Sequence, residues 1–232
     1  MTMSATGAGT RNSGSAQDAA YSWLKQHIAT LPRHQGTFLT EAEVTVATGT
    51  SRTPVREALL RLEAEGFLQI MPKKGAFVPP ITDAEIQAVM QARGLVEDWC
   101  IRRIVPSVGS VLRDLEQLLR RQDELRDQPV EFIGCDREFH RTAVRAAGNP
   151  VLADFYESLR DRQVRMGLRA IAASPERARV VLAEHRKIVE GVRSGDPERA
   201  ARAVAAHLSA TLNALQLPAA DRWVSVAEGV SS

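Results

Sequence analysis

The C-terminal half of the chain carries residues of the types that bind divalent metal ions. Asp136 and His140 are four residues apart, so on a helix both side chains point to the same face. His185 and His207 follow later, each among apolar residues. Imidazole and carboxylate groups are common ligands of zinc, nickel, manganese and iron. Together, the four residues could hold one such ion.

Each of these histidines also has a simpler interpretation. A histidine on an apolar helix face is usually a core or interface residue whose hydrogen bonds are satisfied. Two ligands such as Asp136 and His140 would alone bind a divalent ion weakly. Cys135 is next to Asp136 but points about 100° away on a helix, so we do not count it as a ligand. The residues by themselves leave both interpretations open.

A second group of residues could contact DNA. Arg52 and Arg56 are four residues apart near the start of a predicted helix, so both can project toward one surface. The arginine fork matches O6 and N7 of guanine. Ser51 and Thr53, at the same helix start, can donate hydrogen bonds to phosphates. The plainer alternative is an amphipathic helix with solvated arginines.

The elements around these arginines indicate a winged helix-turn-helix. Apolar spacing predicts a helix over 16–31, and a capping box at 40–43 begins a short helix that stops near Gly49. The helix opened by Thr53 and Pro54 ends near Gly66. Strand-like runs at 67–70 and 76–78 then form a hairpin.

This arrangement makes the DNA interpretation the stronger one. In a helix-turn-helix, the N-terminal residues of the second motif helix meet base edges in the major groove. Lys73, Lys74 and Gly75 lie at the hairpin tip, which suits a wing that touches the DNA backbone or minor groove. A winged helix used only for protein contacts remains an alternative, and it predicts no salt-dependent DNA affinity.

The rest of the chain is predicted to be helical. After Pro79 and Pro80, helices are expected at 83–105, 108–126, 130–147, 150–173, 175–194 and 197–217. The expected fold is therefore mainly α, a winged helix-turn-helix followed by an all-α six-helix bundle. The expected division is a flexible tail at 1–15, a DNA-binding domain at 16–79, a helical effector-binding and dimerisation domain at 80–217, and a C-terminal tail at 218–232.

Composition restricts the class of protein without identifying it. Hydrophobic residues make up 44% and charged residues 25%, as in ordinary globular proteins. Residues 1–80 carry eight Lys/Arg against six Asp/Glu, and residues 81–232 carry 22 against 22, so the net charge of +2 lies in the N-terminal third. No apolar run reaches the roughly 18 residues that span a bilayer. With no signal peptide and two isolated cysteines, a cytoplasmic protein is expected.

The segment predicted to contact DNA also resembles a known family. Residues 51–66 (SRTPVREALLRLEAEG) and 74–78 (KGAFV) strongly resemble the GntR family of regulators. The resemblance implies that Ser51, Arg52, Thr53, Arg56 and Gly75 contact DNA. The preceding segment 41–50 departs from the family, which more often has a Leu-Ala pair and a leucine before this glycine; the helix should survive with smaller core side chains.

Residues 81–217 look like the FCD domain of the FadR/VanR-type branch of that family. This resemblance implies that Asp136, His140, His185 and His207 bind a metal, and six helices would suit the VanR-like subgroup. It also implies that Arg93 faces a ligand cavity and binds an anionic effector, since a guanidinium can clamp a carboxylate. The alternative is an ordinary surface pair of Arg93 with Glu97.

The expected function is a ligand-responsive, DNA-binding transcriptional regulator, specifically a repressor. Its expected partners are double-stranded operator DNA, a small organic acid and a second copy of the chain in a homodimer, with no membrane contact. The alternative is a metal-dependent enzyme acting on a small carboxylate or ester. No general base beside the ligands and no nucleophile motif is evident, so we do not expect an enzyme.

Overall fold

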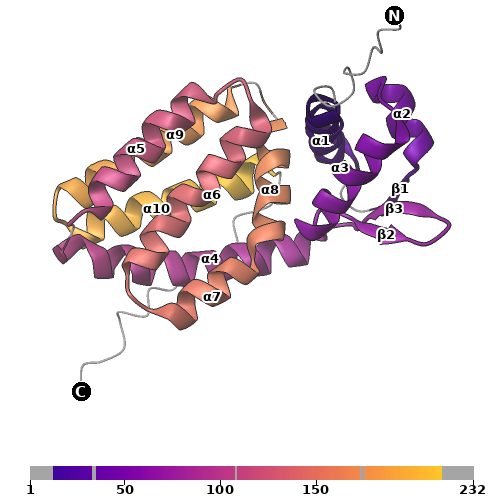
Figure 1. Ribbon diagram of the computed structural model, residues 1–232. Coiled ribbons are helices and arrows are strands. Elements are labelled where there is room, and N and C mark those ends of the chain that lie inside the picture. Colours follow the sequence, from indigo (N-terminus) through magenta and orange to yellow (C-terminus); the bar gives the residue numbers. More distant parts are fainter. Residues whose placement is uncertain (1–12, 33–34, 108, 173, 175, 216–232) are drawn as a thin grey trace, which may run out of the picture. The chain divides into compact units, whose positions relative to one another are not determined.

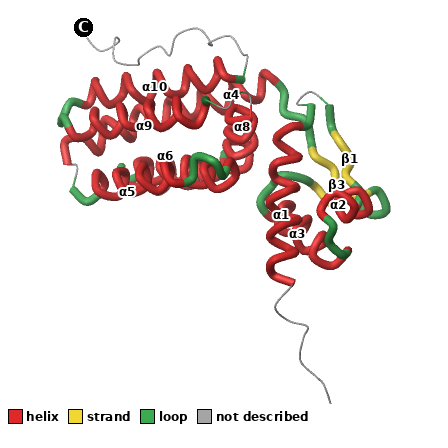
Figure 2. The backbone as a smooth tube through the Cα atoms, turned by 90° about the horizontal axis from the view of Figure 1, so that it is seen from above, coloured by secondary structure: helices red, strands yellow, loops and turns green. Residues whose placement is uncertain are grey.

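The computed structural model describes residues 13–215 except 33–34, 108, 173 and 175. The chain divides into two compact units, 1–81 and 82–232, whose elements are shown in Figures 1 and 2. Residues 1–12 of the tail expected at 1–15, and all of the tail expected at 218–232, lie outside the described residues. The first described helix begins at Ser13, inside the segment expected as a tail.

The N-terminal unit has three helices and a three-stranded antiparallel sheet in its described residues. The sheet order is β1-β3-β2. The elements are α1 (Ser13–Thr30), β1 (Thr37–Leu39), α2 (Glu41–Thr48), α3 (Arg52–Ala64), β2 (Gln69–Met71) and β3 (Gly75–Val78). Helices α1 and α3 pack together, and their apolar faces form the core with Phe67.

Local signals correctly placed the boundaries of α2. Thr40 is its N-cap: the Thr40 hydroxyl accepts a hydrogen bond from the Glu43 backbone N–H, and the Glu43 carboxylate accepts one from the Thr40 backbone N–H. The helix ends at Gly49, whose φ of 65° is left-handed. Strand β1 was not expected. Its three residues are too few to show an alternating pattern, and pairing with β3 stabilises it.

The C-terminal unit is entirely helical in its described residues. Helices α10 and α9 pack together, α10 also packs on α4, and α6 packs on α4, α5 and α8. The elements are α4 (Asp83–Ile104), a 3-10 turn η1 (Val105–Ser107), α5 (Val111–Glu124), α6 (Pro129–Ala146), α7 (Pro150–Ser158), α8 (Arg160–Ala172), α9 (Arg177–Arg193) and α10 (Pro197–Ala214).

The count of six helices in this unit was wrong, because seven α-helices occur in its described part. The single helix expected over 150–173 is α7 and α8, which meet at Leu159. The backbone N–H of Leu159 donates to the Tyr156 carbonyl at 3.2 Å, a tight turn, and the Leu159 side chain is buried. No Pro or Gly marks this break, so only packing produces it. The VanR-like subgroup was expected because of six helices, so the seven helices remove the support for that expectation.

One glycine brings two helices close together. A Cβ atom on Gly191 of α9 would lie 2.6 Å from the Cα of Ala200 on α10, so only glycine permits this approach. Helix α10 starts sharply beside it, with Asp196 as N-cap accepting from two backbone N–H groups. The close pair α9 and α10 carries two of the predicted metal ligands.

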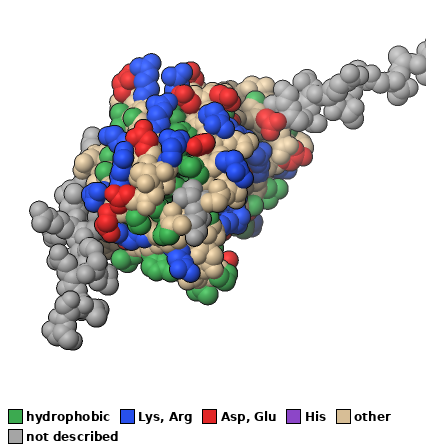
Figure 3. All heavy atoms as spheres, turned by 90° about the vertical axis from the view of Figure 1, so that its left-hand side faces the viewer, with side chains coloured by type: hydrophobic (Ala, Val, Ile, Leu, Met, Phe, Trp, Pro, Cys, Tyr) green, Lys and Arg blue, Asp and Glu red, His purple; other side chains and the backbone are tan. Residues whose placement is uncertain are grey.

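The charged surface is mixed in sign. On the face shown in Figure 3, Lys and Arg side chains alternate with Asp and Glu side chains, in keeping with the even charge count of residues 81–232. Among the helices that the structure describes, none combines the length and apolar character needed to cross a bilayer.

Candidate functional site

The four predicted metal ligands converge in the core of the C-terminal unit. Asp136 and His140 lie on α6, His185 on α9 and His207 on α10. One ligand atom from each residue lies within 4.8 Å of the others. The three histidines are buried, with at most 3% of each residue exposed, and Asp136 is partly exposed. Side chains far apart in sequence thus share one small space.

Each histidine uses its Nδ1 atom on a neighbouring polar group. In each case Nδ1 lies 2.8 Å from a side-chain oxygen: Glu97 Oε2 for His140, Gln122 Oε1 for His185 and Glu184 Oε2 for His207. Such partners fix the ring orientation and tautomer of metal-binding histidines. The Nε2 atom of each ring is therefore the one left for a metal.

Unpartnered nitrogens in the cluster support this reading. Among the described residues, Nε2 of His140 and Nε2 of His185 are buried and have no hydrogen-bond partner. Asp136 Oδ1 lies 3.4 Å from His185 Nε2 and is also 3.4 Å from Gln122 Nε2. An unpaired buried polar atom is costly, and a divalent ion would occupy both nitrogens. The residues present thus fit a metal ion.

The electrostatics keep the two histidines of α9 and α10 neutral. Burial, followed by the charges of the other histidines, holds the pKa of His185 well below its ordinary value. Burial also lowers the pKa of His207, against the opposing effect of Glu184. A neutral imidazole is the form that binds metal.

Arg93 and Glu97 form a buried pair, so the surface-pair alternative was wrong. Arg93 Nε donates to Glu97 Oε1 at 2.7 Å, and Tyr156 donates to the same oxygen at 2.7 Å. Burial alone would raise the pKa of Glu97, but Arg93 and His140 hold it far below its ordinary range. Glu97 thus links Arg93 to the metal cluster through His140.

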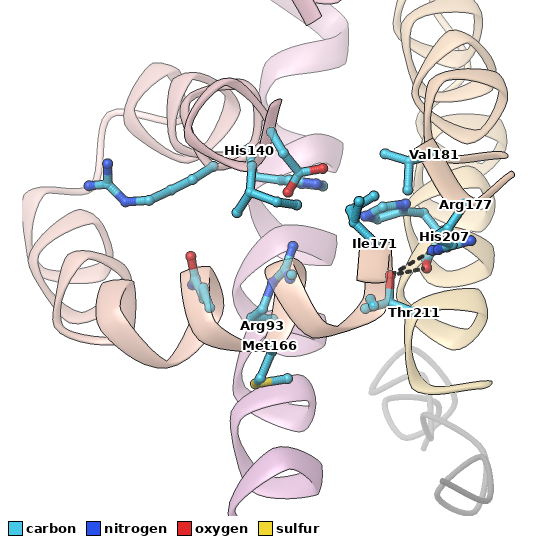
Figure 4. A pocket seen from close by; sticks show the side chains of 14 residues that line it. Arg93, His140, Met166, Ile171, Arg177, Val181, His207 and Thr211 are labelled. Carbon is cyan, nitrogen blue, oxygen red and sulfur yellow. Dashed lines mark hydrogen bonds between the residues drawn. The ribbon is translucent and has the colours of Figure 1, made fainter. Parts of the chain in front are cut away.

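A small cavity lies beside the cluster. Its volume is about 20 Å³, enough for a water molecule or an ion. Figure 4 shows Arg93 rising from α4 toward His140, with Arg177, His207 and Thr211 on the opposite wall. Only Nε of Arg93 hydrogen-bonds within the described chain, to Glu97, so its two Nη groups are available to a ligand.

The predicted DNA contacts of the first group lie together on α3. Ser51 is the N-cap of α3 but its hydroxyl makes no capping hydrogen bond, so it stays available. Arg52, Thr53 and Arg56 are all exposed on the first two turns. Arg56 Nε donates to Glu41 Oε1 of α2 at 2.7 Å, so this side chain is bonded to α2 through its Nε atom.

Of the other two predicted contacts, Lys73 lies in the turn between β2 and β3, and Gly75 is the first residue of β3. The backbone N–H of Lys74 donates to the Met71 carbonyl, and Lys73, exposed, has a φ of 65°, as in a type II turn after proline. Gly75 has a φ of 100°, and a Cβ there would lie 2.6 Å from the Leu39 carbonyl oxygen. Gly75 therefore has a structural role, whether or not it touches DNA.

Sequence reasoning missed the partners of the histidines. Gln122 continues the buried positions Val111 and Leu115 of α5, so a polar residue at a core position was the available signal. Glu184 directly precedes His185 but offered no such signal. Arg177 was also missed: it binds Glu184 and donates to Thr211 Oγ1 at 3.0 Å.

Two family models match the chain. Residues 16–78 match the model of bacterial regulatory proteins of the gntR family, and residues 88–210 match the FCD domain. The two matches cover the two units separately, and the second contains Arg93 and all four candidate metal ligands.

Curated relatives and solved structures agree with these matches. The chain is 34% identical over 203 residues to an uncharacterised HTH-type transcriptional regulator in an unstable DNA locus of Streptomyces ambofaciens, covering 84% of this chain and 83% of that one. It is 30% identical over 194 residues to the HTH-type transcriptional repressor RspR of Escherichia coli (strain K12), covering 81% and 83%. The structure of a GntR transcriptional regulator from Rhodococcus sp. RHA1 matches with a TM-score of 0.59 at 21% identity, over 89% of this chain and 97% of that one, and shows the fold alone.

Proposed function

The chain belongs to the GntR family of bacterial regulatory proteins and carries an FCD domain, and on this premise we propose that it is a repressor controlled by a small organic acid. It is a DNA-binding transcriptional regulator, and its relatives are named as regulators, not enzymes. The alternative of a metal-dependent enzyme has no support among them. Since operator DNA lies in the cytoplasm, we propose that the protein acts there.

For DNA recognition we assign the exposed start of α3 and the hairpin turn. Arg52 and Arg56 are the candidates for reading guanine, while Ser51 and Thr53 are the candidates for binding phosphate. The helix start is suited to phosphate, since its backbone N–H groups and dipole attract anions. Lys73 and Gly75 are assigned to the wing.

For sensing we assign the cluster of α6, α9 and α10. Asp136, His140, His185 and His207 would hold one divalent ion, which when bound supplies open coordination positions for an oxygen ligand. An acid would place its carboxylate there and accept hydrogen bonds from the free Nη groups of Arg93. The observation that carries this proposal is the pair of unpartnered Nε2 atoms within the cluster.

Helix α4 is the element that can transmit ligand binding. It carries Arg93 and Glu97 of the site, and its N-terminus at Asp83 follows the segment that connects it to the DNA-binding unit. A bound ligand would displace the Arg93 side chain, and because Arg93 belongs to α4, this displacement would act directly on the position of the helix. A coupling of only about 1–3 kcal/mol is needed for a regulatory response.

A homodimer is proposed because two apolar pairs are exposed on packed helices. Leu95 and Trp99 on α4 are 61% and 44% exposed, and Val151 and Phe155 on α7 are 74% and 45% exposed. Each pair is four residues apart, so each forms one helix face, and α4 packs against α7. Such an apolar patch marks an interaction surface. The two DNA-binding units of a dimer would read two half-sites of the operator.

The deciding experiment is metal analysis of full-length protein purified without chelator or affinity tag. We expect one divalent ion per chain in the wild type, and its loss in His185→Ala together with the response to acids, while DNA binding persists. If the wild type carries no metal, and added zinc, nickel or manganese leaves its melting temperature unchanged, the histidines are core residues. Sequencing the DNA fragments that the protein retains would identify its operator.

A further inference from the structure

Glu41 on α2 binds one of the two arginines at the start of α3. Arg56 Nε donates to Glu41 Oε1 at 2.7 Å, so the contact joins the two helices. The side chain of Arg52 makes no hydrogen bond or ion pair within the part of the chain that the structure describes. Both arginines are exposed on the surface assigned above to DNA. Glu41 therefore distinguishes two otherwise similar side chains.

The backbone around Glu41 is fixed by its own hydrogen bonds. The capping box of Thr40 and Glu43 encloses it, and the Glu41 carbonyl oxygen accepts a hydrogen bond from the Thr45 hydroxyl at 2.6 Å. Glu41 is also the first residue of α2, where the helix dipole favours a negative charge. Because α2 packs on α3, the carboxylate reaches Arg56 from a backbone that is already held in place.

This ion pair contributes little to the stability of the fold. The side chain of Arg56 is 62% exposed and that of Glu41 is 33% exposed, and water and salt strongly screen such pairs. Its effect on recognition is larger, because a long side chain that must be ordered during binding weakens that binding. Glu41 orders Arg56 before DNA arrives.

The charge of Glu41 also determines which part of DNA suits Arg56. A phosphate attracts an arginine through its charge, and Glu41 both compensates the charge of Arg56 and repels a phosphate. The edge of guanine presents O6 and N7, which accept hydrogen bonds but carry no net charge. A guanidinium keeps its other N–H donors when a carboxylate binds its Nε, so it can still bind a base.

From these observations we propose that Glu41 is a positioning residue that directs Arg56 toward a guanine base and away from phosphate. Glu41 thereby sets the specificity of this contact with the operator. The inference rests on the base-reading role proposed for Arg56 and adds the residue on which that role depends. Arg52, which has no such partner among the described residues, should act independently of Glu41.

The test begins with DNA duplexes that the full-length wild type selects from a randomised pool. Each base pair of the selected sequence is then replaced in turn, and fluorescence anisotropy measures the affinity for every replacement and for a random duplex. The base pair read by Arg56 is the one whose replacement no longer weakens binding in Arg56→Ala. The loss of affinity on replacing this pair is the discrimination to be compared among variants.

Glu41→Ala removes both the hydrogen-bond acceptor and the charge. We expect the discrimination to fall about two- to tenfold, the effect of one long side chain that must be ordered during binding. Affinity for the random duplex should rise, and its logarithmic dependence on salt should steepen by up to about 0.9, because Arg56 then acts on phosphates with its full charge. Glu41→Gln keeps an acceptor without the charge, so it should recover part of the discrimination while random binding stays raised.

Glu57→Ala is the matched control for charge. Glu57 is exposed on α3 next to Arg56, and its side chain has no partner among the described residues. The control removes the same charge from the same surface, so binding to all duplexes should rise alike and the discrimination should stay. Glu41→Ala should not lower the discrimination at any base pair in the Arg56→Ala background, whereas its effect should persist in the Arg52→Ala background.

The outcomes separate this inference from the role on which it rests. Unchanged discrimination in Glu41→Ala, an equal fall in Glu57→Ala, a further fall in the Arg56→Ala background, or weaker random binding in Glu41→Ala would each overturn the role of Glu41 alone. If Arg56→Ala weakens binding to the selected and random duplexes equally, the base-reading role of Arg56 fails, and the role of Glu41 fails with it. Should Glu41→Ala not fold, the intermediate discrimination expected of Glu41→Gln decides.

Discussion

Oε2 of Glu184 lies 2.8 Å from Nδ1 of His207, and the same carboxylate pairs with Arg177. Burial alone would raise the pKa of Glu184, but the hydrogen bonds from His207 and Arg177 hold it below its ordinary value. A charged carboxylate therefore stays against the imidazole, fixes its tautomer and makes it a stronger ligand. His207 and the ligand cavity are thus linked through one acidic residue.

The first prediction concerns this contact. Glu184→Gln should lower metal affinity about 10- to 100-fold with the fold retained, because the amide can keep a hydrogen bond but not the charge. Competition titration with a chromogenic chelator measures the affinity. Glu190→Gln, an exposed position on the same helix, should leave it unchanged. Equal affinities of the two variants would remove Glu184 from the proposed centre.

The metal-free protein should lose stability as the pH falls below about 6.5. The pKa values of His185 and His207 are lowered in the folded state, so the unfolded chain takes up protons first. Their contribution is complete above the unfolded pKa and falls toward the folded pKa, by up to about 1.4 kcal/mol per pH unit for each histidine.

Urea unfolding of chelator-treated protein between about pH 7.5 and pH 5.5 measures this slope. The double variant His185→Gln, His207→Gln should show a shallower slope than the wild type, since other groups titrate equally in both. Identical slopes would mean that the two histidines are not held neutral in the folded core.

Substitutions on α3 and in the wing should affect DNA binding differently. Arg52→Ala and Arg56→Ala should each weaken binding to the selected operator by about 1–3 kcal/mol and affect random DNA less. Lys73→Ala should weaken binding to all sequences and flatten the salt dependence by about one unit of slope. Fluorescence anisotropy at several salt concentrations measures both, with Arg113→Ala on α5 as control. Equal losses on operator and random DNA for the arginine variants would exclude base reading.

Gly75→Ala should destabilise the wing without any DNA present. Its φ of 100° and the 2.6 Å approach of a Cβ to the Leu39 carbonyl oxygen together predict a cost of about 1–3 kcal/mol. Gly134→Ala is the control, because a Cβ there meets nothing within 4 Å and helical alanine is favoured. Chemical unfolding followed by circular dichroism compares the two; equal stabilities would show that the turn relaxes.

A charge placed on the exposed apolar face of α4 should separate the proposed dimer. Leu95→Glu, at a position 61% exposed, should leave the chain folded and shift light scattering toward the monomer mass. The affinity for the operator should fall as well, since a monomer has one DNA-binding unit and reads only one half-site. Arg113→Glu tests whether any added charge has this effect. A wild type that is already monomeric at micromolar concentration would refute the dimer.

Much of the fold follows from signals that are local in the sequence. Most helices could be placed from the capping box at Thr40 and Glu43, from the prolines that open α6, α7 and α10, and from the apolar spacing between them. These signals are local because caps and periodicity act within one or two turns. The four metal-ligand candidates also followed from residue type and resemblance. Their convergence on one another needed the structure.

Other features depend on contacts between distant residues, which no local pattern encodes. Strand β1 exists because β3 pairs with it, and the break at Leu159 has no glycine or proline to mark it. Gln122 and His185 are 63 positions apart, and Arg177 and Thr211 are 34 apart. Arg93 and Glu97 likewise have the spacing of a surface ion pair on a helix. Only their burial in the folded chain makes them part of the site. The sequence by itself determined which residue types were available, and tertiary packing decided which of them lost their water and therefore needed one another.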